Sequence, residues 1–141
     1  METRIRRPAA VWVLFADLVI LGIGGLYGGI LFLIDPSGAR MGVPLSLLDG
    51  LPLRDFLLPG VFLLLMMGLA PLALSVAVWR RWSRAWQATV VLGIVLMIWL
   101  VGEFALWGYQ APIQIVTGML CVILLGACLL PSVRRWLQPQ A

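Results

Sequence analysis

Two carboxylates stand inside long apolar runs, and they are the residues of this sequence best suited to chemistry. Asp17 interrupts the run from residue 9 to residue 34, and Glu103 lies in the run from residue 87 to residue 107. A carboxyl group costs about 2.5–3.5 kcal/mol at the centre of a membrane helix on insertion scales, so it is expected to have a partner or a function. Groups of this kind can exchange protons or bind cations.

Glu103 has aromatic and amide neighbours at helical spacing. Trp99 and Trp107 stand four residues on either side of it, and Gln110 follows seven residues later. Residues three, four and seven apart lie on one face of a helix. The face resembles the wall of a ligand pocket. The alternative is that Glu103 only fixes how the helices pack.

The partners of Glu103 must come from other segments at a similar depth. We expect at least one candidate within hydrogen-bonding distance of Glu103, or joined to it by one water. The candidates are Tyr27, Gln114, Thr117 and Arg54. For Arg54 the favoured alternative is a local ion pair with Asp55 or Asp49, since exposed ion pairs are common and weak.

Asp17 lies about 12 Å into the first helix at 1.5 Å per residue. Gly24 and Gly28 follow on the same face, and Gly25 and Gly29 form a second pair of small residues that lets helices approach closely. Asp17 is therefore predicted to face a neighbouring helix, where Asp17→Asn is tolerated and Asp17→Leu loosens the bundle. The alternative is a purely structural hydrogen-bonding group. The predicted depths of Asp17 and Glu103 differ by about 10 Å, which indicates two separate sites.

The residue types argue against metal, haem and disulfide chemistry. The sequence has no His, and its two cysteines, Cys121 and Cys128, stand seven residues apart in an apolar run. On one helix their α-carbons are about 10 Å apart, whereas a disulfide needs less than about 7 Å. No nucleophile stands beside a base, so no catalytic residue, metal ligand or cofactor is assigned.

The composition is that of a membrane protein. Of the 141 residues, 62% are hydrophobic and 11% are charged, and the mean hydropathy is +1.06. Soluble domains are only about half apolar. The net charge of +4 could suggest nucleic-acid binding, but the arginines cluster beside apolar runs, which is how membrane topology is encoded. Nucleic acid is therefore excluded as a partner.

The sequence predicts an all-α fold, a bundle of four transmembrane helices in a single domain over residues 1–141. The spans cover about 9–34, 57–79, 87–107 and 113–130. Pro71 predicts a kink in the second span. Between the first two spans, Pro44 and Gly50 flank a short apolar stretch. This stretch is expected to form an extracytoplasmic helix of one or two turns lying at the membrane interface.

The arginines predict the orientation. Eight lie in the two tails and the second connection, and two lie in the first connection. Positively charged segments stay on the cytoplasmic side, so both termini are predicted to be cytoplasmic and the protein to reside in the cell (inner) membrane. Five tryptophans cluster at the same boundary, in agreement with an aromatic belt.

Several short stretches resemble small uncharacterised prokaryotic membrane proteins of four helices. They are Asp35-Pro36-Ser37-Gly38, Leu47-Leu48-Asp49-Gly50, residues 54–60, Trp79-Arg80-Arg81, Gly108-Tyr109 and residues 130–135. The resemblance covers most of the chain and implies the four-helix fold, with no activity attached. A looser similarity to DoxX-type proteins rests on size and helix count.

Two classes of function fit these observations. The first is a non-enzymatic membrane protein, either an accessory subunit of a larger membrane complex or a binder of a lipid-like ligand, with Glu103, Trp99, Trp107 and Tyr27 around the ligand. The second is a small transporter or channel that works as a homo-oligomer, in which Asp17 and Glu103 carry protons or cations. Membrane lipid is the expected partner in both.

Overall fold

The computed structural model of the chain describes residues 6–138. Arg4, one of the eight arginines on the predicted cytoplasmic side, lies outside them. The described residues form helices and turns and contain no strand. Four helical stretches are long and apolar enough to cross a membrane. They are α1 (Ala9–Ile34), a second stretch over Leu57–Trp79, α4 (Ala85–Trp107) and α5 (Pro112–Leu129). The expected all-α bundle is thus confirmed.

The second stretch changes its winding along its length. It consists of α2 (Leu57–Phe62), the π-helical segment η3 (Leu63–Leu69) and α3 (Ala70–Trp79). Pro71 has no N–H to donate to the preceding turn, which favours a wider turn at that point. The irregularity expected at Pro71 therefore takes the form of a π-helical segment immediately before it.

Glycines bring α1 into backbone contact with η3. A Cβ atom on Gly25 would lie 2.1 Å from the backbone carbon of Met67, and one on Gly29 would lie 2.7 Å from the backbone nitrogen of Leu64. No side chain fits at either position. The other expected pair does not pack in this way, because Gly24 is exposed and has nothing within 4 Å of its Cβ position. The contact face of α1 is therefore rotated away from Gly24.

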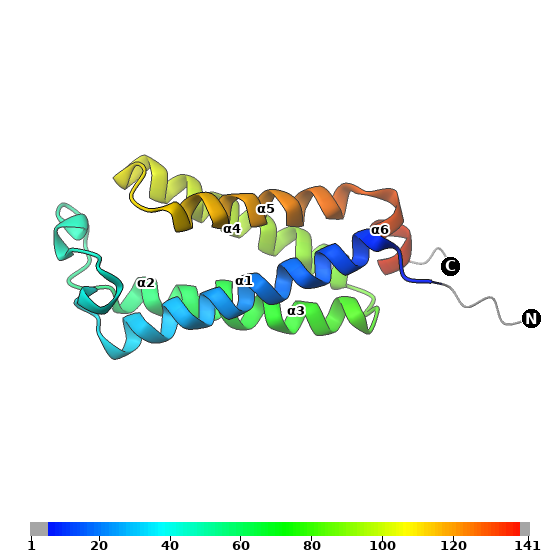
Figure 1. Ribbon diagram of the computed structural model, residues 1–141, viewed down its shortest axis with the longest axis horizontal. Helices are drawn as coiled ribbons and strands as arrows, with labels where there is room; N and C mark the ends of the chain where they lie inside the picture. Colours follow the sequence, from blue (N-terminus) through cyan, green and yellow to red (C-terminus); the bar gives the residue numbers. More distant parts are fainter. Residues whose placement is uncertain (1–5, 139–141) are drawn as a thin grey trace, which may run out of the picture.

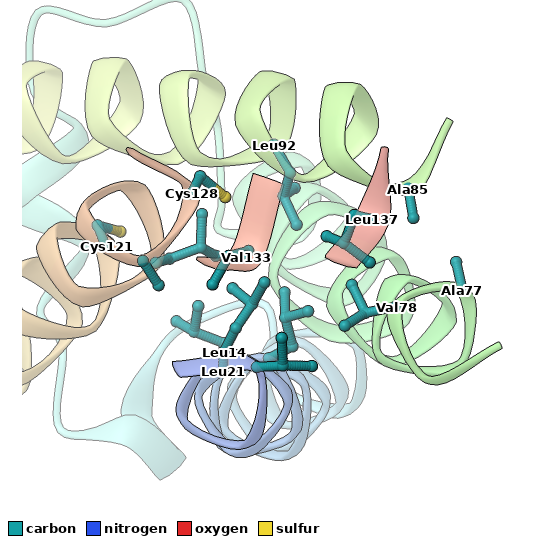
Figure 2. Packing of buried hydrophobic residues seen from close by; sticks show 14 of the residues in the cluster. Leu14, Leu21, Ala77, Val78, Ala85, Leu92, Cys121, Cys128, Val133 and Leu137 are labelled. Carbon is teal, nitrogen blue, oxygen red and sulfur yellow. The ribbon is translucent and has the colours of Figure 1, made fainter. Parts of the chain in front are cut away.

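One end of the bundle, called the arginine end here, holds the start of α1, the turn at residues 80–84 and a short helix, α6 (Pro131–Leu137). Figure 1 shows α6 turning back across this end after α5. Its side chains Val133 and Leu137 are fully buried, and in Figure 2 they point into the core together with Leu14 of α1. The main hydrophobic core lies in this half of the bundle.

The opposite end, called the loop end, holds residues 35–56 and the turn at residues 108–111. Residues 35–56 contain two single-turn 3-10 helices, η1 (Ala39–Met41) and η2 (Leu45–Leu48), and η2 lies where a helix of one or two turns was expected. Its position at a membrane interface stays a prediction. A second, smaller core forms beneath η1 and η2 from Phe32, Leu48 and Phe56. The rings of Phe32 and Phe56 stack with centroids 5.1 Å apart. The segment is thus packed onto the bundle.

Candidate functional site

Glu103 lies on α4 near the loop end, and Trp99 is its direct hydrogen-bond partner. The indole Nε1 of Trp99 donates to Oε1 of Glu103 at 2.8 Å, one helical turn away. The Trp99 ring in turn stacks on Phe62 of α2, with centroids 4.1 Å apart and planes inclined by 20°. This stack holds the indole in place. One carboxylate oxygen is thereby fixed, while the carboxyl group stays half-buried.

Gln114 approaches the same carboxyl from the start of α5. Its side chain lies beside Glu103, while its Oε1 accepts hydrogen bonds from the backbone N–H groups of Gln110 at 2.7 Å and Ala111 at 3.4 Å. Gln114 therefore caps the first turn of α5 as well as facing Glu103. The Gln110 side chain turns away and donates to the carbonyl of Trp107. Of the four expected partners of Glu103, Gln114 is the one placed beside it.

Trp107 connects this region to residues 35–56. Its indole N–H donates to the carbonyl oxygen of Leu47 in η2, sixty residues away in the sequence. The ring is half-buried against the small core at the loop end. This hydrogen bond between residues distant in the sequence holds residues 35–56 against the α4–α5 hairpin. The aromatic face predicted around Glu103 thus divides: Trp99 binds the carboxyl and Trp107 binds the connection.

Three other residues that were predicted to surround Glu103 do not form a hydrogen bond with it: Tyr27, Arg54 and Thr117. Tyr27 is 67% exposed on α1. The contacts of Gly29 with Leu64 and of Phe62 with Trp99 place Tyr27 about two turns, or roughly 10 Å, away from the level of Glu103. The depth estimated from the sequence counted residues from the start of each helix, and the packing of the helices does not keep that count for Tyr27.

Neither Arg54 nor Thr117 takes part in the hydrogen bond of Glu103. Arg54 is exposed in the first connection, and its local pair with Asp55 or Asp49 stays a prediction. Asp55 accepts a hydrogen bond from the backbone N–H of Leu57 at 3.0 Å. Thr117 is half-buried on α5, one turn further along than Gln114.

Asp17 occupies a different environment in the core of the arginine end. Its side chain is 3% exposed, and within residues 6–138 neither carboxyl oxygen has a hydrogen-bond partner. The thiols of Cys121 and Cys128 on α5 lie within electrostatic range of it. Both cysteines are free and almost completely buried. Asp17 therefore faces the bundle interior as predicted, but without the expected partner.

Two buried hydroxyls, which sequence reasoning missed, lie near the same level. Antiparallel pairing of Gly22 with Leu72 and Gly68 places Asp17 about level with Ser75 of α3. Ser75 donates to the carbonyl of Leu72 at 2.6 Å, and Thr89 donates to the carbonyl of Ala85 at 2.7 Å. Both are at most 4% exposed. Single hydroxyls in apolar spans gave no distinguishing signal.

Asp17 and Glu103 are further apart along the bundle than the sequence predicted. Asp17 lies level with residue 75, and the Phe62–Trp99 stack places Glu103 near residue 58. At 1.5 Å per residue this corresponds to a separation of about 25 Å. They form two sites, as expected, with most of the bundle's length between them. Within the described residues, no three His, Cys, Asp or Glu side chains are grouped to hold a metal ion.

The arrangement at Glu103 can accept a hydrogen bond or a cationic group from a ligand, because the Trp99 bond engages one of the two carboxylate oxygens. The flanking rings of Trp99 and Phe62 offer apolar surface beside that polar point. Comparison of the chain with protein-family models, curated proteins and solved structures gives no match.

Proposed function

We propose that the protein is a non-enzymatic membrane component that binds a lipid-like ligand at the loop end, with Glu103 receiving the ligand's head group. The observation that carries the proposal is the Trp99–Glu103 hydrogen bond combined with the Trp99–Phe62 stack. A carboxylate held at a fixed position beside aromatic surface suits a molecule with a hydrogen-bond-donating head and an apolar body. The same surface would suit an accessory subunit that receives its ligand from the bilayer.

Residues 35–56 support a binding role because they are packed over this end. The Trp107–Leu47 hydrogen bond and the Phe32–Phe56 stack hold the connection against the bundle. A ligand head placed at Glu103 would therefore lie under a folded connection, shielded from water, while its apolar part follows the helices. Shielding strengthens a hydrogen bond to a carboxylate.

Native mass spectrometry of the full chain in mild detergent tests the proposal. The wild-type protein should retain an amphipathic molecule, and Glu103→Gln should retain it about tenfold less, because a hydrogen bond to a carboxylate is worth roughly 1.4 kcal/mol more than one to an amide. Asp49→Asn is the matched control, since Asp49 is an exposed acid at the same end. Equal retention by wild type and Glu103→Gln would remove the proposal. The same spectra report subunit number and any co-purified partner.

A second candidate function, proton or cation transport in a small oligomer, is favoured by Asp17. A carboxyl group that is 3% exposed and has no hydrogen-bond partner within residues 6–138 destabilises the bundle, which suggests that it is kept for function. The protein reconstituted in vesicles with a pH-sensitive dye inside should carry a proton flux that Asp17→Asn abolishes. Flux that is absent from wild type, or unchanged by the substitution, would exclude this candidate.

The orientation forms part of the proposal: both termini cytoplasmic, in the cell (inner) membrane. It is supported by the convergence of both described chain ends and the 80–84 turn at the arginine end (Figure 1). Reporters fused to either terminus should give a cytoplasmic signal. A signal from the opposite side for the C-terminal fusion would contradict the four-span arrangement.

A further inference from the structure

The arginine end carries an uncompensated positive charge. Three segments far apart in the sequence contribute arginines to it. These arginines are Arg6, Arg7, Arg80, Arg81, Arg84, Arg134 and Arg135. Within residues 6–138 the only carboxylate in this half is that of Asp17, which is buried. The remaining acids of the described chain, Asp35, Asp49, Asp55 and Glu103, belong to the loop end. The described part of this end thus has an excess of positive charge, which an anionic molecule can neutralise.

Arginine–tryptophan contacts join the 80–84 turn to α6. The Nε of Arg81 donates to the carbonyl of Trp136 at 3.0 Å, and its guanidinium carbon lies 4.3 Å from the centroid of the Trp136 ring. The guanidinium carbon of Arg134 lies 5.1 Å from the centroid of the Trp86 ring. These contacts bring together segments that are 55 residues apart. The two arginine clusters form one surface as a result.

Tryptophans at this end indicate the depth of that surface in the membrane. Trp12 and Trp82 are 50% and 55% exposed, and Trp12 packs edge-on against Trp79 with centroids 5.1 Å apart. Exposed indole rings at the end of apolar spans sit at the level of lipid head groups. Arginines at that level lie beside lipid phosphates. This placement favours a lipid over a soluble polyanion.

We propose that the 80–84 turn and α6 form a binding site for the phosphate head group of an anionic phospholipid. Arg80, Arg84 and Arg135 are exposed and supply guanidinium groups to the phosphate. A guanidinium that stacks on an aromatic ring keeps in-plane N–H donors available, so Arg134 contributes without leaving Trp86. The bound lipid also bridges α6 to the bundle and stabilises its buried face, Val133 and Leu137.

Lipid titration of the full chain tests this site independently of Glu103. The protein in neutral detergent is titrated with phosphatidylglycerol or with phosphatidylcholine, and bound lipid is counted by native mass spectrometry. Phosphatidylglycerol should bind more tightly. Arg80→Gln/Arg84→Gln should weaken its binding about twenty-fivefold, at roughly fivefold per arginine. The matched control, Arg40→Gln/Arg54→Gln, removes two exposed arginines from the loop end and should leave binding unchanged.

The outcomes that overturn the proposal are distinct. Equal binding of the two lipids, or an equal loss in the control variant, refutes a site at the arginine end. Displacement of the lipid by inorganic phosphate at the same concentration refutes a lipid site in favour of a free-phosphate site. If the double variant does not fold, the single variant Arg135→Gln should still show about fivefold weaker binding. Phosphatidylglycerol should also slow amide hydrogen exchange in α6, and unchanged exchange contradicts the bridging role.

Discussion

Replacing Asp17 with leucine is expected to stabilise the bundle, although the sequence alone predicts the opposite. The sequence leads one to expect a hydrogen-bonding partner for the carboxyl group, and none is present within residues 6–138. Leucine has the same branching as aspartate but is larger, because two methyl groups take the place of two oxygens, so the neighbouring side chains must repack to some extent. Exchanging an unpaired polar group for an apolar one of similar shape is neutral or stabilising.

The size of the effect follows from the burial of Asp17, whose side chain is 3% exposed. An aspartate at the centre of a membrane helix costs about 2.5–3.5 kcal/mol, whereas leucine contributes about 0.5 kcal/mol favourably. Repacking around the new methyl groups costs up to about 1.5 kcal/mol. The free energy of unfolding of Asp17→Leu should therefore exceed that of wild type by about 2 kcal/mol. Asp17→Asn should change it less, since the amide stays unpaired.

The assay is reversible unfolding in mild detergent titrated with sodium dodecyl sulfate, followed by circular dichroism. Leu18→Ala provides the control for sensitivity, because Leu18 is fully buried beside Asp17 and its truncation should cost about 2–5 kcal/mol. If Asp17→Leu unfolds at a lower denaturant fraction than wild type, the carboxyl group stabilises the fold and the reasoning fails. A more stable variant that has lost proton flux would show that Asp17 is kept for transport.

Three further predictions test the packing and the loop end. Gly25→Ala should lower the free energy of unfolding by at least about 2 kcal/mol, because its Cβ would lie 2.1 Å from the Met67 backbone. Gly24→Ala, with open space around it, should not lower the free energy of unfolding. Equal losses in the same unfolding assay would contradict the packing of α1. Trp107→Phe removes the hydrogen bond to Leu47 in residues 35–56 and should speed amide exchange in η2 by roughly tenfold. Unchanged exchange would mean that residues 35–56 are held by apolar contacts alone. Hydrogen bonds from the Ser37 hydroxyl and from the Arg40 backbone N–H lower the pKa of Asp35. The ionised Asp35 therefore stabilises the turn at residues 35–40 above about pH 4, and this stabilisation is lost as the pH falls through the lowered pKa. Exchange of the Arg40 amide should accelerate over that range in wild type but not in Asp35→Asn.

The part of the Glu103 site that lies on one helix could be predicted from the sequence. Trp99 and Glu103 are one turn apart on α4, and their side chains do meet. The contacts that come from other segments could not be predicted, because Phe62 and Leu47 are ordinary apolar residues until the fold brings them beside Trp99 and Trp107. Helix α6 was also missed, although Pro131 at its start and the apolar residues on either side of Arg134 and Arg135 were visible signals.

Hydropathy and chain breaks determined the helices, their number and their ends. Four apolar runs bounded by arginines, prolines and glycines predict the spans to within about two residues, because these signals are local. The tertiary structure decided which way each helix faces. In a membrane bundle the surface towards lipid is as apolar as the surface towards the core, so apolar periodicity does not report the rotation of a helix. Close packing against η3 selects Gly25 and Gly29 for the interior, and it leaves Gly24 and Tyr27 on the outside.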